Sequence, residues 1–246
     1  MTLGIPENAA GIYRRVSEAL RRSSTPAGEV KLIAVSKTFP AETVAEAMDA
    51  GLHRFGENRV QEITSKYLEL AGRKTVKAPD GNSAPVEWHF IGHLQTNKVK
   101  KLLEVPTRLI HSVDRLELAI ELDRQLQKRS ESREILIEVN TSGEESKSGV
   151  EPDRALSLMA EIARFGTLKI KGLMTIGALT DDRSVVRNCF MKLGELFRNA
   201  REEGIAGVEM VELSMGMSGD FEIAVEEGAT MIRVGTAIFG ERSKIG

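Results

Sequence analysis

Cysteine is nearly absent from the sequence: Cys189 is the single one among 246 residues. One cysteine excludes an internal disulfide framework and a zinc site built from several thiolates, and it is typical of a protein of the reducing cytosol. Cys189 shares a helical spacing with Val186, Leu193 and Phe197. This pattern predicts a small residue buried in the core.

An excess of charge of one sign is also missing. Lysine and arginine total 34 and aspartate and glutamate 36, which gives a formal net charge of -2. Such a chain has no strong field to attract nucleic acid or an anionic membrane. The basic run "NKVKK" at 97–101 is interpreted as a solvated helix face, with a nucleic-acid patch as the alternative.

Long hydrophobic runs are lacking as well. No stretch approaches the length of a membrane span, and the first residues show no basic start followed by an apolar segment. We therefore expect a cytoplasmic protein with neither a membrane nor a nucleic acid as partner.

What the sequence does contain is a repeated alternation of short apolar segments and helical patterns. Segments such as "LIAV" and "GLMTI" are apolar at consecutive positions, which is typical of parallel strands covered on both faces. Eight such units predict an α/β fold: one (β/α)8 barrel, forming a single domain over residues 1–246. The predicted strands span 31–37, 53–57, 87–92, 108–113, 134–140, 169–176, 208–214 and 230–236.

Helical patterns separate these strands, and one extra helix, at about 6–22, precedes the first. Asp114 is a predicted N-cap, and Gly166 and Gly204 are predicted helix ends. The stretch 72–87, rich in glycine, proline and lysine, is interpreted as an irregular surface insertion. The other predicted helices span 41–51, 114–129, 152–166 and 184–204.

Two glycine-containing loops follow the seventh and eighth predicted strands, "LSMGMSGD" (213–220) and "RVGTAIFG" (233–240). In (β/α)8 barrels these two loops often hold a phosphate at the carboxyl ends of the strands. Backbone N–H groups and the hydroxyls of Ser214, Ser218 and Thr236 could surround such an anion. No Walker motif and no Gly-x-Gly-x-x-Gly is present, so a nucleotide held in either usual way is not expected.

Lys37 ends the first predicted strand, which neighbours the eighth when a barrel closes. A lysine desolvated among apolar residues loses proton affinity, and its neutral amine can form a Schiff base with an aldehyde. The ligand implied is a phosphorylated aldehyde or ketone, and a solvated strand end is the alternative. Lys169 and Lys171 open the sixth strand at the opposite rim, which makes them poor candidates.

Arg233 alternates with Gly235 along the eighth strand and is predicted to point inward. An ion pair with Glu57 or Glu138 is the competing role for this arginine. His89 and His93 are four residues apart at a strand end, where a helical metal pair cannot form, so we expect no metal site. The loop 141–149 is interpreted as solvated, with a mobile lid carrying Lys147 as the alternative.

Seven segments taken in order are similar to the pyridoxal phosphate homeostasis protein family: "AVSKTFP", "FGENRVQE", "WHFIGHLQTNK", "IHSVD", "GLMTIG", "LSMGMSGD" and "VRVGTAIFGER". The resemblance covers about residues 7–242 and implies a fold like the barrel domain of alanine racemase. It further implies that Lys37 carries pyridoxal 5'-phosphate as an internal aldimine and that Arg233 faces the ring nitrogen. By the same resemblance, phosphate is held by Ser214, Ser218, Gly235 and Thr236, and the pocket is lined by Asn58 and His89.

The resemblance leaves a carrier and an enzyme to be distinguished. Racemisation of an amino acid needs two bases, and in alanine racemase the second is a tyrosine from a C-terminal domain. Here the tyrosines, Tyr13 and Tyr67, fall in helical segments, and we expect no such C-terminal domain to follow the barrel. We expect a monomeric carrier of pyridoxal phosphate with transient contacts to enzymes that use it. An amino-acid racemase and a phosphosugar aldolase are the alternatives.

Overall fold

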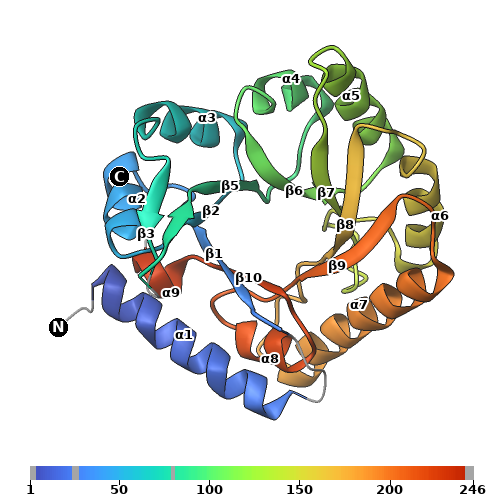
Figure 1. Ribbon diagram of the computed structural model, residues 1–246. Coiled ribbons are helices and arrows are strands. Elements are labelled where there is room, and N and C mark those ends of the chain that lie inside the picture. Colours follow the sequence, from blue (N-terminus) through green and yellow to red (C-terminus); the bar gives the residue numbers. More distant parts are fainter. Residues whose placement is uncertain (1–3, 24–27, 79–80, 242–246) are drawn as a thin grey trace.

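Eight parallel strands form a closed barrel in the computed structural model, which describes residues 4–23, 28–78 and 81–241 (Figure 1). Around the barrel the strand order is β1-β10-β9-β8-β7-β6-β5-β2. The predicted (β/α)8 barrel and all eight of its strands are thereby confirmed. Their bounds are β1 (Lys31–Val35), β2 (Arg54–Glu57), β5 (Glu87–Phe90), β6 (Thr107–Val113), β7 (Arg133–Glu138), β8 (Leu168–Met174), β9 (Val208–Ser214) and β10 (Met231–Val234).

Helices surround the barrel as an outer ring (Figure 1). The extra helix α1 is present, and its apolar face packs beside α8 and α9. The helices are α1 (Ile5–Arg22), α2 (Ala41–Asp49), α3 (Val60–Glu69), η1 (Thr96–Lys98), α4 (Val99–Leu102), α5 (Leu116–Gln127), α6 (Pro152–Ile162), α7 (Arg183–Glu203), α8 (Phe221–Glu226) and α9 (Thr236–Phe239). A single domain over 1–246 stays a prediction, because both chain ends lie outside the described residues.

Helix boundaries follow some of the expected signals and depart from others. Gly204 ends α7 in the left-handed conformation, with φ of 61°, as predicted for a helix end. The N-cap assigned to Asp114 is wrong: Arg115 is the N-cap of α5, and the Asp114 carboxylate binds the Arg115 guanidinium at 2.6 Å. Gly166 also fails as a helix end, because α6 already ends at Ile162.

The prediction that the stretch 72–87 is irregular is wrong. It carries a small hairpin of β3 (Thr75–Lys77) and β4 (Ser83–Pro85). Val76 pairs with Ala84 in antiparallel register and is buried in the hydrophobic core. Burial of this side chain explains why the segment is ordered despite its polar composition. Residues 79 and 80 of the stretch lie outside the described part.

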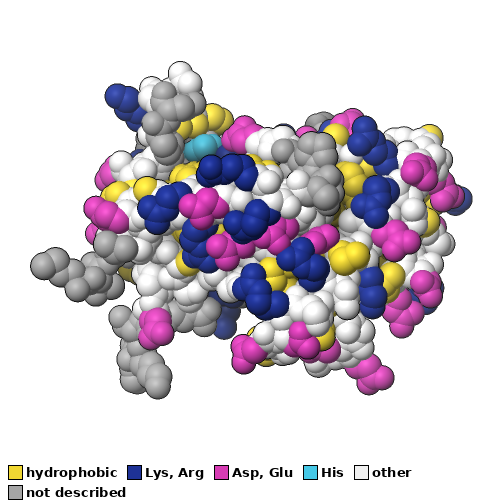
Figure 2. All heavy atoms as spheres, turned by 90° about the horizontal axis from the view of Figure 1, so that it is seen from below, with side chains coloured by type: hydrophobic (Ala, Val, Ile, Leu, Met, Phe, Trp, Pro, Cys, Tyr) yellow, Lys and Arg dark blue, Asp and Glu magenta, His cyan; other side chains and the backbone are white. Residues whose placement is uncertain are grey.

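The outer surface mixes charges of both signs. Figure 2 looks onto the side of the barrel where α1, α7 and α8 lie, and shows lysine and arginine interleaved with aspartate and glutamate. Arg15 binds Glu222 at 3.0 Å, and Glu226 binds both Arg22 and Arg187. Exposed pairs of this kind contribute at most about 1 kcal/mol each. In the described part of the chain no helix is long and apolar enough to cross a membrane.

Two further predictions about surface and core are confirmed. The basic run at 97–101 forms the end of η1 and most of α4, where Val99 is buried while Lys100 and Lys101 are exposed. It is a solvated helix face. Cys189 is buried within α7, as expected for a small core residue.

The pairing of β8 with β9 requires a glycine at position 172. The register shifts between Ile170 and Gly172, where φ is 151°, and a Cβ at Gly172 would lie 1.8 Å from the Glu212 carbonyl oxygen. We expect Gly172→Ala to lower the free energy of unfolding by at least about 1–3 kcal/mol, measured by urea denaturation. The control is Gly11→Ala, within α1, where an added Cβ would have no contacting atom within 4 Å. This change should raise the free energy of unfolding by about 0.5–1 kcal/mol. Equal effects of the two changes would contradict this account of β8.

Candidate functional site

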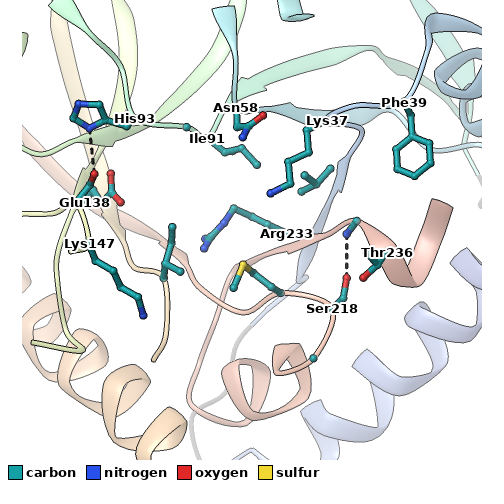
Figure 3. A pocket seen from close by; sticks show the side chains of 17 residues that line it. Lys37, Phe39, Asn58, Ile91, His93, Glu138, Lys147, Ser218, Arg233 and Thr236 are labelled. Carbon is teal, nitrogen blue, oxygen red and sulfur yellow. Dashed lines mark hydrogen bonds between the residues drawn. The ribbon is translucent and has the colours of Figure 1, made fainter. Parts of the chain in front are cut away.

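A cavity of about 470 Å³ opens at the carboxyl ends of the strands, where the sequence predicts the site. The predicted residues that line it are Lys37, Asn58, Ser218, Arg233, Gly235 and Thr236. Figure 3 shows Lys37 and Arg233 extending into this cavity, with Ser218 and Thr236 along one side. The fold thus brings together six of the eight predicted residues.

Lys37 follows β1 in a turn of unusual geometry. β1 pairs with β10 at Ala34 and Val234, so Lys37 and Thr236 emerge from neighbouring strands. Thr38 has φ of 71°, a conformation costly for a β-branched residue, and its N–H donates to Glu62 Oε2 at 2.6 Å. A strained residue held by Glu62 indicates that the surrounding structure fixes the backbone of the turn that carries Lys37.

A buried ion pair stabilises the residue on the other side of Lys37. Lys66, from α3, donates to the Ser36 carbonyl oxygen at 2.7 Å and to Glu57 Oε1 at 2.6 Å. The Ser36 hydroxyl donates to the same carboxylate oxygen at 2.6 Å. Burial raises the pKa of Glu57, while Lys66 acts to lower it. Because Glu57 binds Lys66, the proposed Glu57–Arg233 ion pair is wrong.

The loops after β9 and β10 meet at Ser218. Its hydroxyl oxygen accepts from the Gly235 N–H at 3.2 Å and from the Ala237 N–H at 3.3 Å. The first loop is closed by Asp220, whose carboxylate accepts from the Met217 N–H at 2.5 Å. Backbone donors and hydroxyls from both loops therefore lie side by side, as a phosphate site requires.

Arg233 is almost completely buried and donates hydrogen bonds at the carboxyl ends of β8 and β9. One terminal nitrogen donates to Ser214 Oγ at 2.7 Å and the other to the Thr175 carbonyl oxygen at 2.8 Å. Burial lowers the pKa of Arg233 to about 10, with Glu138 and Asp220 opposing the shift. The guanidinium is therefore charged at neutral pH, and its other N–H groups can donate to a ligand.

Ser214 and His89 do not line this cavity, in contrast to the sequence-based prediction. The Ser214 side chain is fully buried inside the barrel, where it accepts from Arg233 and contacts His111 Nδ1 at 3.0 Å. His89 is also interior, with Nδ1 at 2.9 Å from His111 Nε2. Both side chains turn to the barrel interior, which explains why neither reaches the phosphate loops.

Three residues that the sequence analysis had considered only in other roles line the opposite side of the cavity: His93, Glu138 and Lys147. Glu138 lies at the end of β7, and burial, with a further contribution from Asp114, raises its pKa to about 7. Lys147 donates to Glu144 at 2.6 Å and to the Gly177 carbonyl oxygen at 2.8 Å. The position of Glu138 at a strand end was the signal that could have identified it. The loop carrying Lys147 borders the cavity.

The lysines at the amino ends of the strands and the search for metal ligands add no further group to the cavity. Lys171 binds Glu134 and Glu209 at the amino ends of the strands, away from the cavity, and Lys169 is exposed there. Across the described ranges no group of three or more histidine, cysteine, aspartate or glutamate residues could hold a metal ion. The cavity therefore offers an amine, a guanidinium and anion-binding loops, a set suited to a phosphorylated aldehyde.

Comparison with known proteins covers nearly the whole chain. A family model described as alanine racemase, N-terminal domain, matches residues 12–243. The pyridoxal phosphate homeostasis protein of Aquifex aeolicus is 42% identical over 236 residues, which are 96% of this chain and 97% of the relative. The corresponding human protein is 39% identical, over 98% of this chain and 87% of the relative.

Solved structures agree with this assignment. PipY of Synechococcus elongatus, solved with pyridoxal phosphate bound, is 34% identical and superimposes with a TM-score of 0.79, covering 96% of this chain and all of PipY. Alanine racemase of Clostridium difficile, at 13% identity and a TM-score of 0.68, shares the fold alone over 95% of this chain and 57% of its own. With these matches over the whole barrel, the chain belongs to the pyridoxal phosphate homeostasis protein family.

Proposed function

We propose that this protein binds pyridoxal 5'-phosphate reversibly as a Schiff base on Lys37 and holds and delivers it, without robust catalysis of its own. The observation that carries the proposal is the meeting of Lys37, Arg233 and the two anion-binding loops in one cavity. Membership of the homeostasis family and the bound cofactor in PipY support it.

The residues present fit the three polar parts of this cofactor. Ser218, Gly235 and Thr236 would hold the phosphate, Arg233 would face the ring nitrogen, and Lys37 would take the aldehyde carbon. When bound, the cofactor supplies an aldehyde for condensation with an amine and a ring that can withdraw electrons. A charged arginine only donates hydrogen bonds, so it would leave the ring nitrogen unprotonated and weaken that electron withdrawal.

An amino-acid racemase is the alternative function, and it would need a second base in the cavity besides Lys37. Neither Tyr13, on α1, nor Tyr67, on α3, is among the described residues that line the cavity. However, Lys147 and His93 do line it on the side opposite Thr236, and either is a possible second base. We favour the carrier because Lys147 is bound to Glu144 and to the Gly177 carbonyl group.

We further propose that the protein is a cytoplasmic monomer that contacts enzymes using pyridoxal phosphate only transiently. The nearly balanced charge, with a net value of -2, supports the expectation that neither nucleic acid nor membrane is a partner.

The first test is to map the modified lysine. Purified protein loaded with pyridoxal phosphate should be yellow, and borohydride reduction followed by peptide mapping should label Lys37. Lys37→Ala should lose the label at this position, whereas the control Lys171→Ala, at the opposite rim, should keep it. A protein that stays colourless after reconstitution, or a wild-type label confined to another lysine, would refute the assignment.

A second measurement on the same preparation separates carrier from racemase. The loaded protein is incubated with each L-amino acid in deuterated water, and exchange of the α-proton is followed by NMR. The carrier is expected to exchange no faster than free pyridoxal phosphate. Rapid exchange that Lys147→Met abolishes would refute the carrier and favour the racemase instead.

Positioning of Lys37 by the Lys66–Glu57 pair predicts a kinetic effect. The double change Glu57→Gln with Lys66→Met removes the buried pair without leaving one charge alone. We expect Schiff-base formation, followed by visible absorbance, to slow by roughly tenfold or more, because misplacing a reacting group is costly. The control Lys171→Met removes another ion-paired lysine, at the opposite rim, and should react at the wild-type rate. An unchanged rate in the double variant would show that the pair serves stability alone.

Glu138 predicts a distinct pH dependence of stability. Its pKa of about 7 in the folded protein exceeds the ordinary value of 4.5, so the folded state binds the extra proton. The stabilisation by the protonated Glu138 carboxyl is fully present below pH 4.5, the ordinary pKa, and is lost as the pH rises through the folded-state pKa of about 7. Relative to Glu138→Gln, wild-type protein without cofactor should lose about 3 kcal/mol of unfolding free energy from about pH 4.5 to 7. Parallel stability profiles for the two proteins would contradict a raised pKa.

A further inference from the structure

A row of buried polar side chains crosses the interior of the barrel beneath the cavity. Arg233 donates to Ser214, Ser214 contacts His111 Nδ1 at 3.0 Å, and His111 Nε2 lies 2.9 Å from His89 Nδ1. At the far end His89 Nε2 lies 3.6 Å from Glu87 Oε2. The row joins the cofactor cavity to a small cavity of about 60 Å³ lined by Glu87 and His89. These residues come from four different strands.

Donor and acceptor chemistry gives this row one direction. Arginine can only donate, so the Ser214 oxygen accepts and its hydroxyl hydrogen is directed at His111 Nδ1. His111 then carries its hydrogen on Nε2 and donates to His89 Nδ1, which leaves the His89 hydrogen on Nε2, facing the Glu87 carboxylate. The hydrogens from Arg233 to His89 Nδ1 each have an acceptor within hydrogen-bond distance, and the last one, on His89 Nε2, faces the oppositely charged Glu87 carboxylate at 3.6 Å without a hydrogen bond.

The reverse arrangement fails at both ends. If His111 donated from Nδ1, Ser214 would accept twice, and its own hydrogen would have no acceptor among the contacts of its side chain with the described residues. His89 would then present an unprotonated Nε2 to the Glu87 carboxylate, placing two acceptors together. A buried hydroxyl hydrogen left unsatisfied costs about 1–3 kcal/mol, so the Ser214 end favours the first arrangement, and the repulsion between His89 Nε2 and Glu87 adds to this preference.

We propose that His111 and His89 are positioning residues of the cofactor site: as neutral Nε2–H tautomers they orient Ser214, and through it the guanidinium of Arg233. Neither histidine lines the cavity, so both act only through Ser214. The effect on the cofactor rests on the proposed function, whereas the tautomers do not depend on it.

Electrostatic surroundings favour neutral rings. Burial lowers the pKa of His89, although the Glu87 carboxylate acts to raise it, and burial together with His89 and Arg233 lowers the pKa of His111 well below its ordinary value. The contact with His89 lowers the pKa of Glu87 to about 2. Arg54 and Arg108 face the same end and also disfavour a charged His89, and that small cavity is completed by Lys31, Glu134 and Glu212.

The direct test uses the cofactor-free protein. Long-range ¹H–¹⁵N correlation spectra distinguish the two neutral tautomers and the charged ring, and His89→Gln and His111→Asn assign the signals. We expect both rings to be neutral Nε2–H tautomers from about pH 6 to 8, on either side of the ordinary histidine pKa. An Nδ1–H tautomer or a charged ring at either residue would overturn the proposal.

Substitutions at position 111 test the effect on Arg233. An asparagine oxygen can replace His111 Nδ1 as acceptor for Ser214, but a phenylalanine has no acceptor. We expect His111→Phe and Ser214→Ala to shift the visible spectrum of bound pyridoxal phosphate and weaken its binding by roughly tenfold, because a bond to a charged group is lost or misdirected. His111→Asn should remain near wild type in both measurements.

A matched control removes a histidine elsewhere. His53 lines a different cavity, beside α1, so His53→Phe should change neither the spectrum nor the affinity. Wild-type behaviour of both His111→Phe and Ser214→Ala would refute the positioning role. If His111→Phe does not fold, Ser214→Ala decides the same point. Loss of cofactor binding in the wild type would refute the proposed function alone, because the tautomers are measured without the cofactor.

Discussion

Pairing between β1 and β10 is the interaction on which the rest of the site depends. Lys37 and Thr236 are separated by nearly the whole chain, yet they become neighbours because Ala34 pairs with Val234 in parallel register. Parallel closure also brings all carboxyl ends to one rim, which places the amine of Lys37 beside the loops that follow β9 and β10. Any change that opens this seam would therefore separate Lys37 from Thr236.

Two buried polar groups support the two charged side chains of the cavity. Lys66, Glu57 and Ser36 hold the turn that carries Lys37, while Ser214 holds Arg233. Buried ion pairs and polar contacts add little net stability compared with well-packed apolar residues, since desolvation offsets their attraction. Their location directly behind the two functional side chains therefore indicates a role in geometry. Polar side chains in the interior of the barrel therefore orient Lys37 and Arg233 more firmly than loops alone would.

The sequence predicted the barrel and most of the rim because both depend on local patterns. Consecutive apolar residues identified the strands, the rule for carboxyl ends then located Lys37 and Ser218, and alternation with Gly235 indicated that Arg233 points inward. Contacts across the interior could not be predicted in this way: His111 and Ser214 are 103 residues apart, and no periodicity tells which inward side chains meet. Ser214 was misplaced for a related reason, since the last residue of a strand can face either the loop or the interior.

The direction of the interior row bears on why holding the cofactor is favoured over catalysis. If the proposed tautomers hold, each hydrogen bond from Arg233 through Ser214 to His111 is donated away from the cavity. A row so arranged stabilises the positive guanidinium. It cannot pass a proton toward the ring nitrogen, because each side chain in the row accepts on the side facing the cavity and donates on the side facing Glu87. Fast carbanion chemistry benefits from a protonated ring nitrogen. Under the proposed function, this arrangement would retain an aldehyde cofactor without strengthening its electron withdrawal.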